Sequence, residues 1–384
     1  MNLGLWTLTQ KQPVTRREAL DLGRRPPVHG GNVYAFARSR GLSPEQVLDF
    51  SASINPLGWP RGVAKAYRQA LSRVVHYPEP YAETLTHALA AYHDLDPQAL
   101  LVGNGSTQLM YTLARVLAPR RALIVAPSFS EYEAALQHSN AQIGHLVLRP
   151  PVFALSVDRL QKTLTQDYDV LILTNPNSPT GALLPRTQLA QIVRVCRTTQ
   201  TRLIIDETFV DWVEEASLKH WAARSAHIII LRSLTKFFAL PGLRVGYLIA
   251  PPRITARLRA QLEPWSVNTI AQEVARTCLN DQRFVQRSLT FLERERLWLF
   301  QQLSTMEGLQ PLPSQANFLL VRITKKNRCA AEVVQRLADE NILVRDCGNF
   351  VGLGKRFFRV AVRTRSENAR LIAALRAVLR TSSE

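Results

Sequence analysis

Lys236 lies in a largely apolar segment, Ser-Leu-Thr-Lys-Phe-Phe-Ala-Leu-Pro-Gly-Leu-Arg-Val-Gly-Tyr, which begins at Ser233. An ammonium group in apolar surroundings costs free energy, so such a lysine is expected to have a chemical task. A lysine amine can form a Schiff base with an aldehyde cofactor. The hydroxyls of Ser233 and Thr235 and the guanidinium of Arg244 suit a phosphate. The segment therefore predicts that Lys236 carries an aldehyde cofactor with a phosphate group.

A glycine-rich turn, Gly-Asn-Gly-Ser-Thr from residue 103 to 107, lies between an expected strand and an expected helix. Such a turn presents free backbone N–H groups and the positive end of a helix to an anion. Gly105, Ser106 and Thr107 are therefore expected to cradle the phosphate. Asp206 ends another apolar run, and a carboxylate at the carboxyl end of a parallel strand faces the ligand crevice.

The elements that must position these residues follow a regular alternation between residues 60 and 250. Short apolar runs, typical of strands covered on both faces, are separated by amphipathic segments of helical length such as 107–117 and 187–197. This order predicts an α/β fold with a mainly parallel, seven-stranded sheet. The predicted strands are 100–102, 122–125, 143–148, 170–173, 203–205, 228–231 and 245–249.

The second part of the chain changes character. Residues 253–306 are predicted to be mostly helical, with a break at Pro264, and a smaller α+β unit follows. Its predicted strands are 318–321, 342–345 and 357–360, and its predicted helices are 330–338 and 367–379. A chain of 384 residues exceeds what one core usually serves. We expect an N-terminal extension (1–27), a substrate-binding arm (28–58), a large cofactor-binding domain (59–280) and a small C-terminal domain (281–384).

The composition is that of an ordinary globular protein, with 46% hydrophobic and 20% charged residues. The net charge of +18 is spread along the chain without a basic tail, so a solvated basic surface is expected and no nucleic-acid partner. The four cysteines form no Cys-x-x-Cys pair, which predicts no metal site. No run is apolar enough to span a bilayer and no signal peptide is evident, so a cytoplasmic protein without membrane partners is expected.

In order and spacing, these motifs resemble those of the fold-type I pyridoxal phosphate (PLP) enzymes, the aspartate aminotransferase superfamily. The resemblance implies PLP bound to Lys236, with Asp206 pairing with the pyridine nitrogen so that the ring can accept electrons. It implies that Asn177, in the segment Thr-Asn-Pro-Asn-Ser-Pro-Thr-Gly, hydrogen-bonds the ring hydroxyl. Phe129 would stack on the ring. Tyr132, one turn further, is a candidate for the pocket wall.

Two further residues bear on the same resemblance. Tyr77, in the segment His-Tyr-Pro-Glu, matches a tyrosine that reaches the cofactor phosphate of the neighbouring subunit, which implies a homodimer with shared active sites. Phe209 stands where many members carry a tyrosine that donates to the ring hydroxyl. Its presence leaves Asn177 as the main expected partner of that hydroxyl.

The reaction depends on how the substrate is held, because the bond perpendicular to the ring is the one that breaks. The segments at 29–32 (His-Gly-Gly-Asn), 48–58, 263–268, 345–350 and 357–363 together resemble the L-threonine-O-3-phosphate decarboxylase family of cobalamin biosynthesis. The match extends from residue 28 to 379. It implies that a small phosphorylated amino acid, L-threonine O-3-phosphate, is decarboxylated to (R)-1-aminopropan-2-yl phosphate.

The same resemblance assigns the substrate-binding residues. Arg359 would bind the carboxylate, while Arg345, His29 and the backbone of Gly30 would bind the phosphate. Arginine suits both anions, and adjacent glycines let a backbone approach a phosphate closely. Ser53 stands where the family has an asparagine that helps to hold this phosphate, and Asn177 is expected to contact the substrate as well as the cofactor.

Two alternatives use the same fold. A histidinol-phosphate-type aminotransferase would share the cofactor residues and pass the amino group to a keto acid. A non-catalytic binding protein, such as a regulator, would not need the complete set of Lys236, Asp206, Asn177 and Arg244. The His-Gly-Gly-Asn segment distinguishes the decarboxylase from the aminotransferase.

Overall fold

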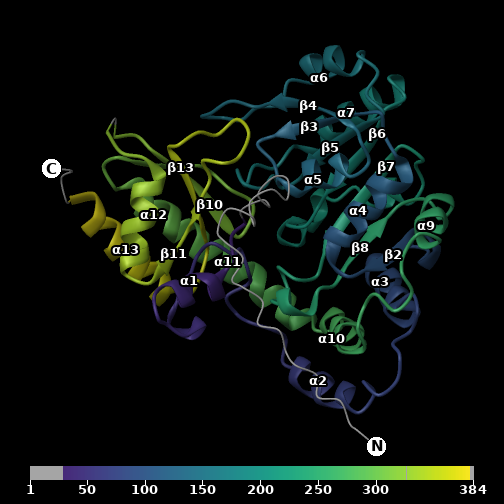
Figure 1. Cartoon of the computed structure of the whole chain (residues 1–384), viewed down its shortest axis with the longest axis horizontal. Coiled ribbons are helices and arrows are strands. Elements are labelled where there is room, and N and C mark those ends of the chain that lie inside the picture. Colours follow the sequence, from purple (N-terminus) through teal and green to yellow (C-terminus); the bar gives the residue numbers. More distant parts are fainter. Residues whose placement is uncertain (1–28, 326, 381–384) are drawn as a thin grey trace, which may run out of the picture.

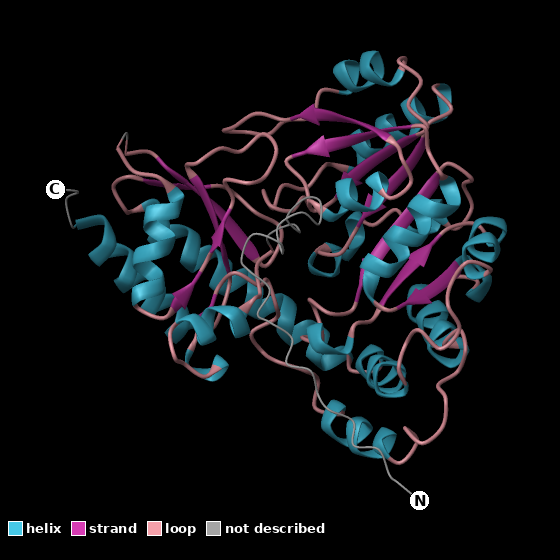
Figure 2. Cartoon of the chain, viewed as in Figure 1, coloured by secondary structure: helices cyan, strands magenta, loops and turns pink. Residues whose placement is uncertain are grey.

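The computed structural model describes residues 29–325 and 327–380. The N-terminal extension predicted for residues 1–27 lies outside this part of the chain. The described residues form a large sheet with helices around it and a smaller sheet beside two helices (Figures 1 and 2). The helix α11 (Gln282–Ser304) lies between these two sheets in Figure 1.

The large sheet has seven strands in the order β2-β8-β7-β6-β5-β3-β4. Every pairing is parallel except those of β8, which runs antiparallel to both β2 and β7. The predicted seven-stranded, mainly parallel sheet is confirmed. The strands are β2 (Leu100–Gly103), β3 (Arg121–Ala126), β4 (Gln142–Val147), β5 (Val170–Thr174), β6 (Arg202–Asp206), β7 (Ile228–Ser233) and β8 (Gly246–Ile249).

Helices cover both faces of this sheet, as Figure 2 shows. Their cover explains why the strands are mainly apolar: every residue of β2, β5, β7 and β8 is buried. The helices between residues 63 and 279 are α2 (Val63–Leu71), α3 (Glu83–His93), α4 (Gly105–Leu117), α5 (Glu131–Gln137), α6 (Val157–Leu164), α7 (Arg186–Thr198), α8 (Lys219–Ala222), α9 (Pro252–Arg259) and α10 (Thr269–Leu279), of which α2 packs against α10 away from the sheet. None of the described helices is long and apolar enough to cross a membrane.

The small sheet is antiparallel, in the order β12-β13-β10-β9, and is accompanied by α12 and α13. Its strands are β9 (Leu309–Pro311), β10 (Phe318–Ile323), β12 (Arg345–Asp346) and β13 (Phe357–Ala361), and its helices are α12 (Ala330–Asp339) and α13 (Arg365–Arg380). In this sheet Arg345 of β12 lies opposite Arg359 of β13, so both guanidinium groups extend from adjacent strands of the same sheet.

The single strand predicted at 342–345 is wrong, because two strands in different sheets occupy it. β11 (Ile342–Leu343) pairs in parallel with β1 (Leu48–Asp49), whereas β12 pairs with β13. The arm is further joined to the small domain by an ion pair from Arg40, after α1 (Val33–Ser39), to Asp339 of α12 (Nη2–Oδ1, 3.2 Å). The start of the described chain therefore packs with its end.

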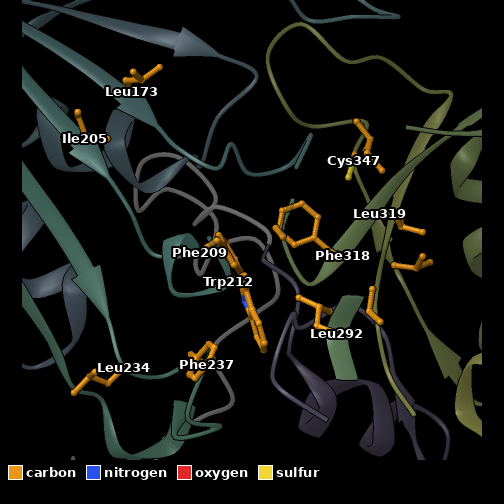
Figure 3. Packing of buried hydrophobic residues seen from close by; sticks show 14 of the residues in the cluster. Leu173, Ile205, Phe209, Trp212, Leu234, Phe237, Leu292, Phe318, Leu319 and Cys347 are labelled. Carbon is orange, nitrogen blue, oxygen red and sulfur yellow. The ribbon is translucent and has the colours of Figure 1, made fainter. Parts of the chain in front are cut away.

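A continuous apolar core connects the two sheets (Figure 3). Phe209, after β6, meets Phe318 of β10 edge to face, with ring centroids 5.0 Å apart. At the first turn of α11, the ring of Phe284 stacks against that of Phe238 with centroids 6.1 Å apart, and further along α11 Leu292 is buried in the same core as Phe318. Burying each such side chain contributes about 1.5–3 kcal/mol. This packing holds the small sheet at a defined position beside the large one.

Candidate active site

A cavity of about 260 Å³ lies at the carboxyl ends of the central parallel strands. Thr174 ends β5, Asp206 ends β6 and Ser233 ends β7, and all three line it. This is the edge at which α/β sheets bind ligands. Fifteen sequence-predicted residues form part of its wall: His29, Gly30, Ser53, Gly105, Ser106, Thr107, Phe129, Tyr132, Asp206, Ser233, Thr235, Lys236, Arg244, Arg345 and Arg359.

Lys236 lies just beyond the end of β7 and lines the cavity. Burial, followed by the charges of Arg359 and Arg244, lowers the pKa of its amine from 10.5 to about 8. Desolvation disfavours the charged form, and nearby cations act in the same direction. The amine is therefore partly neutral near neutral pH, and only the neutral amine can attack an aldehyde.

The predicted phosphate cradle is assembled where α4 begins. Gly105 has φ +75°, and a Cβ at this position would lie 2.6 Å from Nη2 of Arg244. A Cβ on Gly246 of β8 would lie 2.5 Å from the backbone nitrogen of Ser106. Glycine at position 105 thus lets the Arg244 guanidinium come close, and glycine at position 246 lets the backbone of Ser106 come close.

Two hydroxyls complete the cradle. Ser233 Oγ and Thr235 Oγ1 lie 2.8 Å apart and both residues line the cavity. Backbone N–H groups at a helix start, two hydroxyls and an arginine together form a site for a phosphate.

Asp206 is buried in the cavity wall, and burial raises the pKa of its carboxyl. Its Oδ1 accepts a hydrogen bond from the backbone nitrogen of Thr208 at 2.7 Å, and its Oδ2 accepts one from the hydroxyl of Tyr132 at 2.5 Å. Both bonds lower the pKa and oppose the effect of burial. The sequence identified Tyr132 as a wall residue, but its bond to Asp206 was missed.

Asn177 requires a correction, because its side chain does not line the cavity. Its Oδ1 accepts from the backbone nitrogen and the hydroxyl of Thr180 (3.1 and 2.7 Å), and its Nδ2 donates to the carbonyl of Pro127 at 3.1 Å. These bonds tie the amide to its own turn and to the backbone of Pro127. The next residue, Ser178, lines the cavity instead.

Arg359 is buried and points to the same cavity from β13. Its Nη1 donates to Ser178 Oγ at 3.0 Å, its Nη2 donates to the carbonyl of Ser51 at 3.2 Å, and the ring centroid of Phe318 lies 4.8 Å from its guanidinium carbon. Its Nε is buried without a hydrogen-bond partner among the described residues. Burial lowers the pKa of Arg359 to about 10. A buried guanidinium with an unused donor is suited to an anionic ligand.

Arg345 enters the cavity from β12. Its Nη2 donates to Asn349 Oδ1 at 2.8 Å, its Nη1 donates to the carbonyl of Asp346, and its guanidinium carbon lies 5.1 Å from the ring centroid of Phe350. Burial lowers its pKa, although it remains a cation at neutral pH. Two arginines therefore face one cavity from adjacent strands.

The arm closes this side of the cavity. A Cβ on Gly30 would lie 2.3 Å from the carbonyl oxygen of Ser51, and the nitrogen of Gly31 donates to Ser51 Oγ at 2.7 Å. Ser51 Oγ in turn donates to Asp49 Oδ1 at 2.7 Å. The Oγ of Ser53 is buried without a partner among the described residues, which leaves a donor available to a ligand.

Tyr77 does not reach the cavity of its own chain. Its side chain is 82% exposed and rests on Trp265, with ring centroids 5.0 Å apart. Val74 and Val75, close to it in sequence, are also exposed. An apolar surface of this kind is typical of a protein interface.

The residues of the cavity fit PLP. The glycine-lined cradle matches a phosphate, the face of Phe129 matches a flat ring, and the buried Asp206 matches a ring nitrogen that carries a proton. The buried amine of Lys236 matches the aldehyde. Among the described residues, no group of three or more His, Cys, Asp or Glu side chains could hold a metal ion.

The fold and this site define a PLP-dependent enzyme of fold type I. The chain belongs to the aminotransferase class I and II family, whose model matches residues 45–375.

Three relatives refine this assignment. The chain is 40% identical over 353 residues to threonine-phosphate decarboxylase of Salmonella typhimurium, a match that covers 91% of this chain and 96% of the relative. The crystal structure of L-threonine-O-3-phosphate decarboxylase from Porphyromonas gingivalis superposes with a TM-score of 0.78 at 28% identity, over 87% of this chain and 100% of that one. Histidinol-phosphate aminotransferase from Clostridium acetobutylicum superposes with a TM-score of 0.81 at 27% identity, over 86% and 99%. The predicted resemblance to the decarboxylase family is confirmed.

Proposed function

We propose that this enzyme decarboxylates L-threonine O-3-phosphate to (R)-1-aminopropan-2-yl phosphate, a step of cobalamin biosynthesis. The observation that carries the proposal is the pair Arg345 and Arg359, which face the cavity of Lys236 from adjacent strands. A substrate with a carboxylate and a phosphate needs two such cations. The 40% identity to the Salmonella enzyme supports the same reaction.

Arg359 is the proposed partner of the substrate carboxylate. Its donors are held in place by Ser178 and Ser51, and its unused Nε adds a further donor. A fixed guanidinium can orient the carboxylate so that its bond to the α-carbon stands perpendicular to the cofactor ring. PLP, when bound, supplies an aldehyde for the substrate amine and a ring that accepts the electron pair left behind by carbon dioxide.

Lys236 and Asp206 are the proposed catalytic residues. The carboxylate of Asp206 is placed to keep a proton on the ring nitrogen, and the donors Tyr132 and Thr208 favour its ionised form. The lowered pKa of Lys236 allows its amine to take up and release a proton near neutral pH. We infer that Lys236 delivers a proton to the α-carbon after carbon dioxide has left.

Arg345, His29, Ser53 and the backbone of Gly30 are the proposed phosphate-binding residues. All four line the cavity, and Ser53 has an unused buried hydroxyl. In cofactor binding, Ser178 replaces Asn177 as the proposed neighbour of the ring hydroxyl, because Ser178 is the residue of that turn in the wall.

We also propose that the enzyme is a cytoplasmic homodimer. The exposed Tyr77, with Val74, Val75 and Trp265 near it, supports a subunit interface in which Tyr77 reaches the cofactor phosphate of the partner. Cys196, Cys278 and Cys347 are buried as free thiols, which is consistent with a reducing compartment.

The test is the product formed by purified, PLP-loaded protein. With L-threonine O-3-phosphate alone, we expect stoichiometric carbon dioxide and (R)-1-aminopropan-2-yl phosphate, and no turnover for Lys236→Ala. With histidinol phosphate and 2-oxoglutarate, we expect no glutamate. The likeness to histidinol-phosphate aminotransferase makes this second assay necessary. Glutamate formation without release of carbon dioxide from phosphothreonine would overturn the proposal.

A further inference from the structure

A carboxylate holds the histidine of the arm. His29 Nε2 lies 2.7 Å from Glu131 Oε1, and the His29 ring packs on Phe129 with centroids 5.2 Å apart. The side chain of Glu131 is 14% exposed and that of His29 is 39% exposed, so the carboxylate is largely shielded from water while the imidazole is partly accessible. His29 and Phe129 line the cavity, so the contact joins the arm to the proposed cofactor site.

Glu131 is itself fixed from the other side. Its second oxygen, Oε2, accepts a hydrogen bond from the hydroxyl of Tyr111 on α4 at 2.9 Å. Burial, with Glu131 as a further cause, raises the pKa of Tyr111 to about 12, so its hydroxyl remains a donor at neutral pH. Each carboxylate oxygen therefore has one defined partner, and the carboxylate has little freedom to turn away from His29.

We propose that Glu131 is a positioning residue that aims His29 at the phosphate of the substrate. This inference rests on the proposed function, in which His29 contacts that phosphate. Because Nε2 is engaged by Glu131, Nδ1 is the ring nitrogen left for the substrate. The carboxylate of Glu131 at Nε2 fixes the orientation of the ring through one short contact. Glu131 acts through His29 and need not touch the substrate.

The chain contains a matched control on the same helix. Glu133 is two residues after Glu131 on α5, and its Oε2 lies 3.6 Å from Nε2 of His145 on β4. Neither residue lines the cavity that contains Lys236. Glu133→Gln removes a carboxylate beside a histidine from the same helix, without touching the proposed site.

The experiment compares Glu131→Gln with Glu133→Gln in the PLP-loaded enzyme. Binding of phosphothreonine and of L-threonine is followed through the cofactor absorbance, and the steady-state constants are measured with phosphothreonine. For Glu131→Gln we expect about tenfold weaker binding and about a tenfold higher KM for phosphothreonine, as for loss of a charge-assisted bond. We expect kcat and the affinity for L-threonine to change less than about threefold, since L-threonine lacks the phosphate. Glu133→Gln should match the wild type in all respects.

A double-mutant cycle with His29→Ala decides whether Glu131 acts through His29. We expect Glu131→Gln to have no further effect on phosphothreonine binding once His29 is absent. Equal loss of affinity for threonine and phosphothreonine, or a full effect in the His29→Ala background, would overturn the positioning role. The binding measurements do not need turnover. If the wild type binds phosphothreonine but releases no carbon dioxide, the proposed function fails while the role of Glu131 is still tested.

Discussion

The hydroxyl of Tyr132 donates a hydrogen bond of 2.5 Å to Oδ2 of Asp206, the carboxylate proposed to face the cofactor nitrogen. Tyr132 comes from α5 and Asp206 from the end of β6, so the contact joins two parts of the large domain. Thr174 Oγ1 lies 3.1 Å from the same hydroxyl, and Ser128 Oγ lies 3.1 Å from Thr174 Oγ1. A polar chain thus leads from the loop before α5 to Asp206.

Tyr132→Phe should remove one of the two donors that offset the burial of Asp206. The pKa of Asp206 is already raised by burial and lowered by this bond, so it should rise further in the variant. A protonated Asp206 cannot stabilise a charged ring nitrogen. We expect kcat to fall about tenfold or more, as for loss of a bond to a charged group, and the acid limb of the kcat/KM profile to move to higher pH. Ser128→Ala, two bonds further along the chain, is the control and should leave the profile unchanged.

The lowered pKa of Lys236 predicts how the cofactor-free enzyme captures PLP. The capture rate depends on the neutral amine, so it should rise with pH and level off above about pH 8, well below 10.5. The charge of Arg359 is the largest cause of the lowered pKa after burial, so Arg359→Leu should move the midpoint to higher pH. The rate is measured from the absorbance change on mixing with PLP at several pH values. Arg253→Leu removes an exposed positive charge on α9 and should leave the midpoint in place.

Gly105→Ala should weaken PLP binding. The added Cβ would lie 2.6 Å from Nη2 of Arg244, and the φ of +75° is unfavourable for alanine. We expect the dissociation constant of PLP to increase about tenfold, corresponding to a cost of about 1–2 kcal/mol for a left-handed residue. Gly242→Ala is the control, because its Cβ would meet nothing within 4 Å and its φ is not positive. The affinity for PLP is measured by equilibrium dialysis. If Gly105→Ala binds PLP as tightly as the wild type does, this account of the cradle is contradicted.

Tyr77 offers a test of shared active sites. Lys236→Ala and Tyr77→Ala are each expected to have low activity as homodimers. When the two are co-expressed, one site of each mixed dimer would combine an intact Lys236 with an intact Tyr77. Random pairing should then restore about a quarter of the wild-type activity. If Tyr77 acts only within its own chain, the mixture will show no gain over the sum of the separate variants.

Much of the fold could be predicted from the sequence because the strands of the large sheet are buried on both faces. Short, continuous apolar runs such as those of β5 and β7 are typical of strands in the middle of a covered sheet. Lys236 and Asp206 were found for a related reason, since each is a charged residue next to such a run. The strand at 342–345 was misassigned because its first half pairs with β1, which is distant in the sequence.

The site was harder to predict where two neighbouring polar residues could each face the cavity. Asn177 and Ser178 occupy one turn, and the bonds from Thr180 to Asn177, which no sequence pattern reveals, leave Ser178 at the cavity. The contact of Glu131 with His29 and that of Tyr132 with Asp206 were also missed, because no sequence pattern reveals them. They depend on how α5 lies against the arm and β6, which is a property of the packed domain.

The pairing of β1 with β11 has a consequence for the making of the protein. Leu48 and Asp49 are among the first described residues to leave the ribosome, but their partners are Ile342 and Leu343 of a 384-residue chain. The ladder between β1 and β11 can therefore form only after all seven strands of the large sheet have been synthesised, while that sheet can already assemble. Until β11 has been synthesised, Leu48 and Asp49 lack their strand partner, whereas Asn55 of the same arm can already bond to the backbone of Lys236.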